Sequence, residues 1–286
     1  MTVIMDGKKL AQEVKAELKQ RVEELWTSKQ IVPRLAVILV GEDPASQVYV
    51  RNKRQAAEKI GIKTVDNLLP ATVSEADLLD LIYEYNEDPN IHGILVQLPL
   101  PAYIDEAKVT HAILPSKDVD GFHPVNMGHL FMNMPHSLPC TPRGIMELLA
   151  AYGISPAGKE VVIVGRSNIV GRPMVALMLN ADATVTVAHS KTKDLRAVTK
   201  RADILVVATG RPEMITGADI KPGAVVIDVG VNRLADGHLV GDVQHQTVEG
   251  VASYLTPVPG GVGPMTIAML MKQTVEFAEK SGQDGY

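Results

Sequence analysis

The sequence predicts an α/β fold of two domains, each with a parallel sheet and with helices on both faces of that sheet. First, apolar residues at strand spacing and at helical spacing alternate along nearly the whole chain. Second, the run from Arg34 to Val40 is almost entirely aliphatic, as expected for a strand buried on both faces. Third, a strand–turn–helix corner at residues 161–174 begins past the midpoint of the 286 residues, so the preceding half needs its own core.

The composition excludes several classes of protein. Apolar residues make up 46% of the chain, enough for a full core. A net charge of −5 without a basic block weighs against nucleic-acid binding, and the longest aliphatic run is far shorter than a membrane span. The N-terminus lacks the apolar core of a signal peptide, and the single cysteine, Cys140, suits a reducing compartment. We therefore expect a cytoplasmic protein without nucleic-acid or membrane partners.

In the first half of the chain, helical spacing of apolar residues predicts a helix from Asp6 to Trp26. After the strand that ends at Val40, Asp43 and Pro44 are typical of the cap and first residue of a helix, which Gly61 would end. The remaining elements that we expect here are strand 63–69, helix 74–84, strand 91–98 and helix 105–114.

In the second half, Thr141 and Pro142 are expected to open a helix that reaches Tyr152. The alternation then predicts strand 159–165, helix 170–181, strand 183–188, helix 194–201, strands 203–208 and 223–229, a Pro/Gly-rich loop 253–263 and a last helix 265–280. The pattern is interrupted by M-P-H-S-L-P-C-T-P near residues 135–140. We therefore predict domains at residues 1–139 and 140–264.

The corner V-V-I-V-G-R-S-N-I-V-G-R-P-M, residues 161–174, is typical of a dinucleotide site. Gly165 allows a tight turn, Ser167 can donate to a phosphate, and Gly171 lets the helix approach a ligand closely. Its spacing departs from G-x-G-x-x-G, so an ordinary turn without a nucleotide is the alternative. Its position between a strand and a helix favours a Rossmann-type domain, and no Gly-Lys-Ser/Thr of an ATP-type loop follows.

The end of the next strand favours NADP over NAD. NAD-binding proteins carry an acidic residue about 20 positions after the glycine turn, where it binds the ribose hydroxyls. This chain has His189, Ser190 and Lys191 there. Without an acid to repel a 2′-phosphate, Arg166 and Ser190 can bind one, with Lys191 as a further candidate.

Four polar residues of the first half lie on a helix or in loops that follow the predicted sheet, where α/β proteins bind their ligands. Tyr49 and Lys53 lie four positions apart on one predicted helix and therefore share a face. Gln97 closes an apolar strand, and Asp120 lies in the loop K-D-V-D-G-F. Each of them alone also has an ordinary structural explanation.

Together, five segments resemble the methylenetetrahydrofolate dehydrogenase/cyclohydrolase family, in order and over essentially the whole chain. They are Y-V-R-N-K (49–53), V-Q-L-P-L-P (96–101), K-D-V-D-G-F (117–122), G-R-S-N-I-V-G-R-P (165–173) and P-V-P-G-G-V-G-P-M-T (257–266). The resemblance implies a homodimeric, bifunctional enzyme. It would oxidise 5,10-methylenetetrahydrofolate with NADP and hydrolyse the methenyl product to 10-formyltetrahydrofolate at the same site. A cleft would separate a folate domain from the Rossmann-type domain, and the C-terminal helix, 265–286, would pack back on the folate domain.

The resemblance also implies roles for single residues. Lys53 matches the catalytic lysine, Gln97 the glutamine that supports it, and Tyr49 the tyrosine that packs on the aminobenzoyl ring. Asp120 matches the aspartate that binds the pterin, and Pro259 and Gly260 match the loop beside the folate. The positions that match cofactor contacts are Gly165, Arg166, Ser167, Ser190 and Val231. Position 188 is Ala where many members have Cys or Thr, without an evident catalytic consequence.

The neutral amide of Gln97 bears on the charge of Lys53. A carboxylate would hold the lysine protonated by ion pairing, whereas an amide orients it without fixing its charge. A protonated lysine would repel the methenyl cation, and a neutral one can activate water as a base. We therefore hypothesise that Lys53 works partly in its neutral form during hydrolysis.

Two other functions are open from the residues alone. A two-domain NAD(P)-dependent dehydrogenase of a small hydroxy or amino acid would need an Arg or Lys clamp for a carboxylate, which this set of polar residues does not suit. A non-catalytic nucleotide-binding protein would give no NADPH signal with methylenetetrahydrofolate. We expect no metal, because the eight histidines form no H-E-x-x-H motif or Cys/His cluster.

Overall fold

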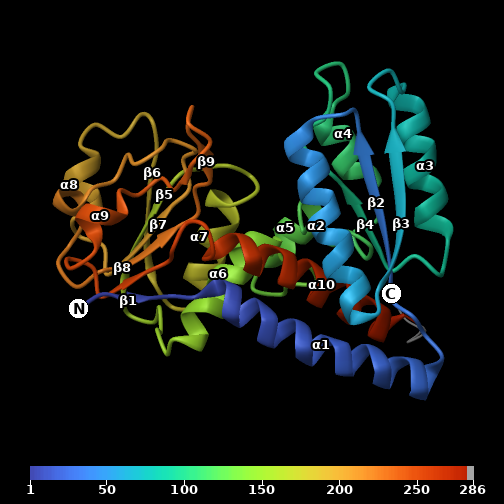
Figure 1. Cartoon of the computed structure of the whole chain (residues 1–286), viewed down its shortest axis with the longest axis horizontal. Helices are drawn as coiled ribbons and strands as arrows, with labels where there is room; N and C mark the ends of the chain where they lie inside the picture. The colour runs from blue at the N-terminus through green and yellow to red at the C-terminus, as the bar shows by residue number, and fades with distance from the viewer. Residues whose placement is uncertain (282–286) are drawn as a thin grey trace. The chain divides into compact units, whose positions relative to one another are not determined.

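The structure is a computed structural model that describes residues 1–281, and the chain forms two compact units (Figure 1). Unit 1 comprises residues 1–11, 130–134 and 139–266. Unit 2 comprises residues 12–129, 135–138 and 267–281. Two helices, α1 (Gly7–Lys29) and α10 (Val262–Lys280), begin in unit 1 and continue into unit 2. Both units are α/β, as the sequence predicts.

Unit 2 is built on a parallel three-stranded sheet in the order β3-β2-β4. Its elements in chain order are β2 (Arg34–Val40), α2 (Pro44–Ile60), β3 (Lys63–Leu69), α3 (Glu75–Glu87), β4 (Gly93–Val96), α4 (Glu106–Ala112) and α5 (Pro124–Phe131). Alternate residues of β2 pack with α3 and α4 in one apolar core, and α2 lies against the other face (Figure 1). Because Leu35 to Val40 are all buried, β2 is a strand covered on both faces, as predicted.

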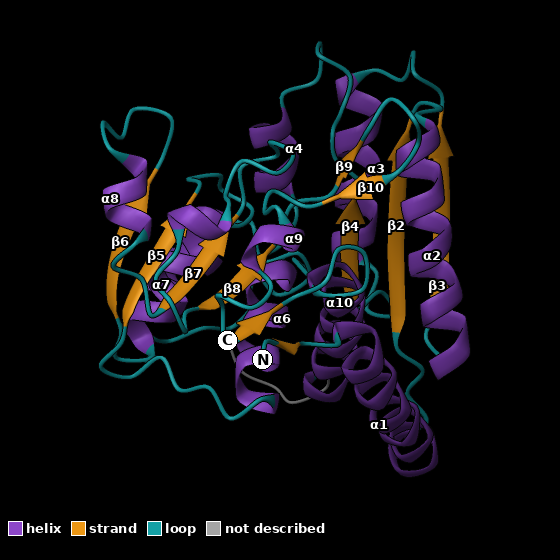
Figure 2. Cartoon of the chain, turned by 60° about the vertical axis from the view of Figure 1, so that its left-hand side comes forward, coloured by secondary structure: helices purple, strands orange, loops and turns teal. Residues whose placement is uncertain are grey.

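Unit 1 contains a parallel six-stranded sheet in the order β1-β11-β8-β7-β5-β6 and a separate antiparallel pair, β9 and β10 (Figure 2). Its elements are β1 (Val3–Ile4), α6 (Cys140–Ala151), β5 (Glu160–Val164), α7 (Gly171–Asn180), β6 (Thr184–Ala188), α8 (Leu195–Thr199), β7 (Ile204–Val207), a 3-10 helix (Gly217–Asp219), β8 (Val225–Asp228), β9 (Asn232–Arg233), β10 (Leu239–Val240), α9 (His245–Val248) and β11 (Tyr254–Leu255). The parallel strands place their carboxyl ends at one edge of the sheet.

Local signals set the ends of α2. The Asp43 side chain accepts a hydrogen bond from the Ser46 amide at 2.7 Å, Pro44 is the first helical residue, and Gly61 ends the helix with φ +90°. These three features are those that the sequence predicts, and the bounds of the helix match as well.

The prediction that Thr141 and Pro142 open α6 was wrong. The helix begins at Cys140 after Pro139, without a side-chain cap, and the Thr141 hydroxyl bonds instead to the hydroxyl of Thr266 at 2.9 Å. Pro142 lies in the first turn, where the amide that proline lacks has no helical partner in any case. A proline there therefore does not fix the first residue.

Several short elements were missed. The sequence predicts neither the helix α5, residues 124–131, nor a strand within the loop 253–263. Tyr254 of β11 pairs with both Val3 and Val225, so this short strand completes the sheet between β1 and β8. Two-residue strands carry no periodic signal of their own.

Within residues 1–281, no helix is long and apolar enough to cross a membrane.

Candidate active site

Lys53 and Tyr49 lie one turn apart on α2, the helix that follows the carboxyl end of β2. Lys53 is 5% exposed, and its Nζ lies 4.6 Å from the centroid of the Tyr49 ring. The same Nζ donates a hydrogen bond to Oε1 of Gln97 at 3.0 Å. The structure thus brings together three of the polar residues that the sequence singles out.

Gln97 is held from both sides. It follows β4, and its backbone amide donates to the carbonyl of Ile38 at 2.9 Å. Its side-chain Nε2 donates to the carbonyl of Leu98 at 2.7 Å. Because the amide nitrogen is occupied by a carbonyl, the amide oxygen faces Lys53. A neutral acceptor is therefore fixed in position against the ammonium group.

The carboxyl of Asp120 interacts electrostatically with Lys53. Burial raises the pKa of its carboxyl to about 6; the Lys53 charge opposes this shift and the Asp118 charge adds to it. Part of the residue still reaches solvent, and none of the described residues donates a hydrogen bond to the carboxyl. Asp120 is therefore a partly desolvated acceptor with room for the donors of a ligand.

The backbone around Asp120 is braced by two buried side chains. Asp118, 2% exposed, accepts hydrogen bonds from three donors: the amides of Gly121 and His123 and the side-chain amide of Asn126. Gln273 of α10 is 1% exposed, and its Nε2 donates to the carbonyl of Val119 at 2.8 Å. The loop that carries Asp120 is thus fixed on both sides of that residue.

Pro259 and Gly260 lie in unit 1, in a loop that backbone contacts hold. The Gly261 amide donates to the carbonyl of Pro257 at 2.9 Å, and the Lys8 amide donates to the carbonyl of Gly260 at 2.8 Å. Gly260 has φ +111°, a conformation that disfavours residues with a side chain. This loop therefore has a defined shape, which glycine makes accessible.

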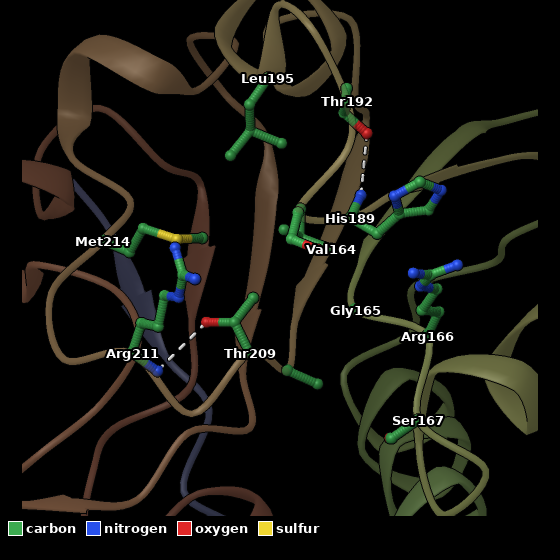
Figure 3. A pocket seen from close by; sticks show the side chains of 12 residues that line it. Val164, Gly165, Arg166, Ser167, His189, Thr192, Leu195, Thr209, Arg211 and Met214 are labelled. Carbon is green, nitrogen blue, oxygen red and sulfur yellow. Dashed lines mark hydrogen bonds between the residues drawn. The ribbon is translucent and has the colours of Figure 1, made fainter.

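A cavity of about 410 Å³ opens at the carboxyl edge of the unit 1 sheet (Figure 3). It is lined by Val164, Gly165, Arg166, Ser167, His189, Ser190, Thr192, Leu195, Ala208, Thr209, Arg211 and Met214. Four residues that the sequence assigns to the cofactor are in this lining. The other two, Gly171 and Val231, are not among the described residues that line the cavity. Gly171 begins α7, and Val231 lies after β8 and is 60% exposed.

The turn between β5 and α7 requires its glycines. Gly165 has φ +132°, and a Cβ there would overlap the carbonyl of Ala208. A Cβ on Gly171 would overlap the backbone of Gly165. Ser167 Oγ accepts hydrogen bonds from the amides of Val170 and Gly171, at 3.2 and 3.4 Å, so its own proton can be donated to a phosphate.

Much of the cavity wall is not predicted from the sequence. Arg211 lies on the opposite side of the cavity from Arg166, with Leu195 and Met214 providing apolar surface (Figure 3). Thr209 and Arg211 follow the carboxyl end of β7, so the rule that pointed to residues after β5 and β6 could have found them. Two guanidinium groups beside an apolar wall suit an anionic ligand that carries rings.

Among residues 1–281, no cluster of three or more His, Cys, Asp or Glu could hold a metal ion.

Comparison with known proteins gives full-length matches. The catalytic domain of the tetrahydrofolate dehydrogenase/cyclohydrolase family matches residues 5–120, and the NAD(P)-binding domain of that family matches residues 139–282. The bifunctional protein FolD of Ligilactobacillus salivarius is 63% identical over 281 residues, which cover 98% of each chain.

Two solved structures share the fold closely. The bifunctional FolD of Campylobacter jejuni has a TM-score of 0.96 at 50% identity and covers 98% of this chain and 99% of its own. The enzyme of Trypanosoma brucei, solved with NADP and an inhibitor, has a TM-score of 0.96 at 40% identity over 99% of both chains.

Proposed function

The chain belongs to the tetrahydrofolate dehydrogenase/cyclohydrolase family, and we propose that four side chains of unit 2 form the folate site that serves both reactions. They are Tyr49, Lys53, Gln97 and Asp120. The protein is an NADP-dependent methylenetetrahydrofolate dehydrogenase and a methenyltetrahydrofolate cyclohydrolase. The observation that carries the proposal is the buried Nζ of Lys53, held 3.0 Å from a neutral amide oxygen.

Asp120 binds the pterin in this proposal. Its carboxylate has open acceptor positions, and a pair of N–H donors on the edge of a pterin fits such a group in a bidentate manner. Tyr49 offers ring surface for the aminobenzoyl group of the folate. The pterin and the aminobenzoyl ring are thereby positioned on either side of the one-carbon unit, close to Lys53.

Lys53 acts as a base in the hydrolysis. Water adds to the methenyl carbon and gives up a proton to the neutral amine. One C–N bond then breaks, the departing nitrogen takes up a proton and the new hydroxyl loses its own, which leaves the formyl group. A protonated amine would repel the positive charge spread over the N–C–N unit of the substrate. Gln97 orients the amine through its oxygen without adding a negative charge that would favour the protonated form.

The cavity of unit 1 fits NADP by its chemistry. The glycines keep side chains out of the turn, so that a pyrophosphate can approach its backbone closely, and β6 ends without an acidic residue. We assign the pyrophosphate to Gly165 and Ser167 and the 2′-phosphate to Arg166 and Ser190, with Gly171 and Val231 as further contacts. When bound, NADP accepts the hydride from the folate carbon.

Substitution of Lys53 tests the shared site. Lys53→Met should reduce hydrolysis by about 10²- to 10⁴-fold, the usual contribution of a general base, and reduce hydride transfer less. One absorbance assay with methylenetetrahydrofolate and NADP follows reduced nicotinamide and methenyltetrahydrofolate together. Lys59→Met, at an exposed position of the same helix, is the matched control. Equal losses in both activities would contradict a role specific to hydrolysis.

Family membership sets aside the two alternatives, a dehydrogenase of small acids and a non-catalytic nucleotide-binding protein. We further propose a homodimer that works in the cytoplasm without nucleic-acid or membrane partners. The family resemblance supports the dimer, and the net charge of −5 with a single cysteine supports the rest. Sedimentation analysis of the purified protein tests the dimer directly.

A further inference from the structure

The turn at residues 209–211 forms one wall of the nucleotide cavity in unit 1. Thr209 and Arg211 line the cavity, and Met214 continues the same wall (Figure 3). Gly210 and Arg211 are exposed, so the contacts of these two residues with the rest of unit 1 are limited. A binding wall of this kind keeps one shape only if a rigid group holds it from behind.

Asp242 is that group. It is fully buried, and its Oδ2 accepts three hydrogen bonds from the turn: from the Thr209 amide at 2.6 Å, the Thr209 hydroxyl at 3.0 Å and the Gly210 amide at 3.0 Å. Its Oδ1 accepts a fourth from Nδ2 of Asn232 at 2.9 Å. The Ile215 amide donates to the backbone carbonyl of Asp242 at 3.0 Å, so the wall is tied at both ends.

Asp242 is in turn fixed by Asp228, at the end of β8. Asp228 is 1% exposed and accepts from the amides of Asp242 and Val243, at 2.9 and 3.1 Å. A Cβ on Gly230 would overlap the Asp242 carboxylate, and one on Gly241 would overlap that of Asp228. The two carboxylates thus sit in spaces that only glycine leaves open.

We propose that Asp242 is a positioning residue for NADP, which acts through the turn 209–211. A buried carboxylate is costly, and an apolar side chain could fill the same space at lower cost. The carboxylate instead holds the turn in one conformation, because three donors that converge on one oxygen fix the directions of the turn amides. The inference rests on the proposed placement of NADP in this cavity.

The two activities of the enzyme separate a cofactor role from a general structural role. Hydrolysis of methenyltetrahydrofolate consumes no NADP, whereas the oxidation does. An amide at position 242 presents N–H donors either to the turn or to Asn232. Asp242→Asn should therefore raise the KM for NADP, and the Kd for NADPH measured by fluorescence, by about tenfold. Its hydrolysis of methenyltetrahydrofolate, assayed without NADP, should stay within about twofold of the wild type.

Asp203→Asn is the matched control. Asp203 is a carboxylate before the amino end of β7, the end opposite the cavity, where it accepts from the Glu160 amide and from Lys221. Its loss should leave the KM for NADP unchanged. If Asp242→Asn does not fold, Asn232→Ala removes one bond to the same carboxylate from a half-buried position. This variant should raise the KM by about threefold.

An unchanged KM for NADP in Asp242→Asn, or in Asn232→Ala where the first does not fold, would overturn the inference. Equal losses in oxidation and hydrolysis would overturn it as well. A wild-type protein that fails to oxidise methylenetetrahydrofolate with NADP would contradict the proposed function itself. An active wild type with an indifferent Asp242→Asn removes only the role of Asp242.

Discussion

The proposed folate site of unit 2 and the nucleotide cavity of unit 1 use carboxylates in opposite ways. Asp242 is fully buried and accepts four hydrogen bonds from protein donors. Asp120 is partly desolvated, receives no hydrogen bond from the described residues, and has a pKa raised to about 6. A carboxylate whose acceptor positions are filled by the protein specifies structure, whereas one with open positions can recognise a ligand.

The same contrast extends to the way each site is built. The nucleotide cavity owes its shape to backbone groups and to glycines such as Gly165, where a side chain would collide. The proposed folate site consists of side chains such as Lys53, held on a helix and two loops. Unit 1 therefore carries its binding geometry in the fold, while unit 2 carries its chemistry in a few replaceable groups.

The sharpest test of this contrast is the stability of two matched Asp→Asn variants. Asp228→Asn places an amide N–H against backbone amides that now donate to a carboxylate. It should destabilise the protein by roughly 2–4 kcal/mol. The measurement is the midpoint of thermal unfolding at pH 7.5 without ligands. A midpoint equal to that of the wild type would break the comparison, because the donors around Asp228 would then contribute nothing.

Asp120→Asn should have the opposite sign and a smaller size. The carboxyl ionises near pH 3.8 when unfolded and near 6 when folded, so the folded state loses stability as the pH rises between these values. Above pH 6 the full penalty is present. The shift corresponds to about 3 kcal/mol, which solvent screening of this partly exposed group reduces, so removal of the charge should stabilise the ligand-free protein by about 1–2 kcal/mol at pH 7.5.

The same variant should bind folate less well. Without the carboxylate, one of the two pterin N–H groups faces an amide donor, and the KM for methylenetetrahydrofolate should rise by about tenfold or more. In the wild type this KM should also rise as the pH falls through about 6, because Asp120 becomes protonated. A variant that is both more stable and unchanged in KM would show that Asp120 does not bind the pterin.

The sequence predicted most of the fold because the signals were local. The aliphatic run of β2 and the Asp43-Pro44 start of α2 are each contained in a few residues, and both were placed correctly. The strand β11 was missed because its two residues gain meaning only from pairing with Val3 and Val225. Long-range pairing leaves no periodic trace in so short a segment.

The two sites differ in the same respect. Tyr49 and Lys53 share a helix face, which their spacing alone predicts, and Gly165 stands in a recognisable turn. Asp242 lies in a Gly-Asp-Val segment that matches no motif. It accepts a hydrogen bond from Thr209, which lies 33 positions earlier in the chain. Only the tertiary structure shows that this aspartate has an architectural role, since nothing in its local sequence distinguishes it from a turn residue.

The smallest effect that we expect concerns His92, an ionisable residue of unit 2 that resembles Asp242 rather than Asp120. It is 8% exposed, and its Nδ1 accepts a hydrogen bond from the Arg34 amide at 3.1 Å. Burial lowers its pKa to about 4, helped by the charges of Lys117 and Arg34 and opposed by Asp88. The neutral ring is therefore part of the structure of unit 2.

Acid should weaken this contact over a defined range of pH. The unfolded histidine takes up a proton near pH 6.5 and the folded one near 4, so stability present above 6.5 is lost as the pH falls towards 4. At pH 5.5 the loss is about 1 kcal/mol. His92→Asn keeps an acceptor for the Arg34 amide and does not titrate, so its unfolding midpoint should fall less between pH 7.5 and 5.5. Because Asp120 acts in the opposite direction in part of this range, both proteins are best compared with Asp120→Asn in place. If the unfolding midpoints of the two proteins fall equally with pH, His92 is as readily protonated in the folded as in the unfolded state. Its ring nitrogen would then not be a buried acceptor filled by the protein, as the carboxylate of Asp242 is.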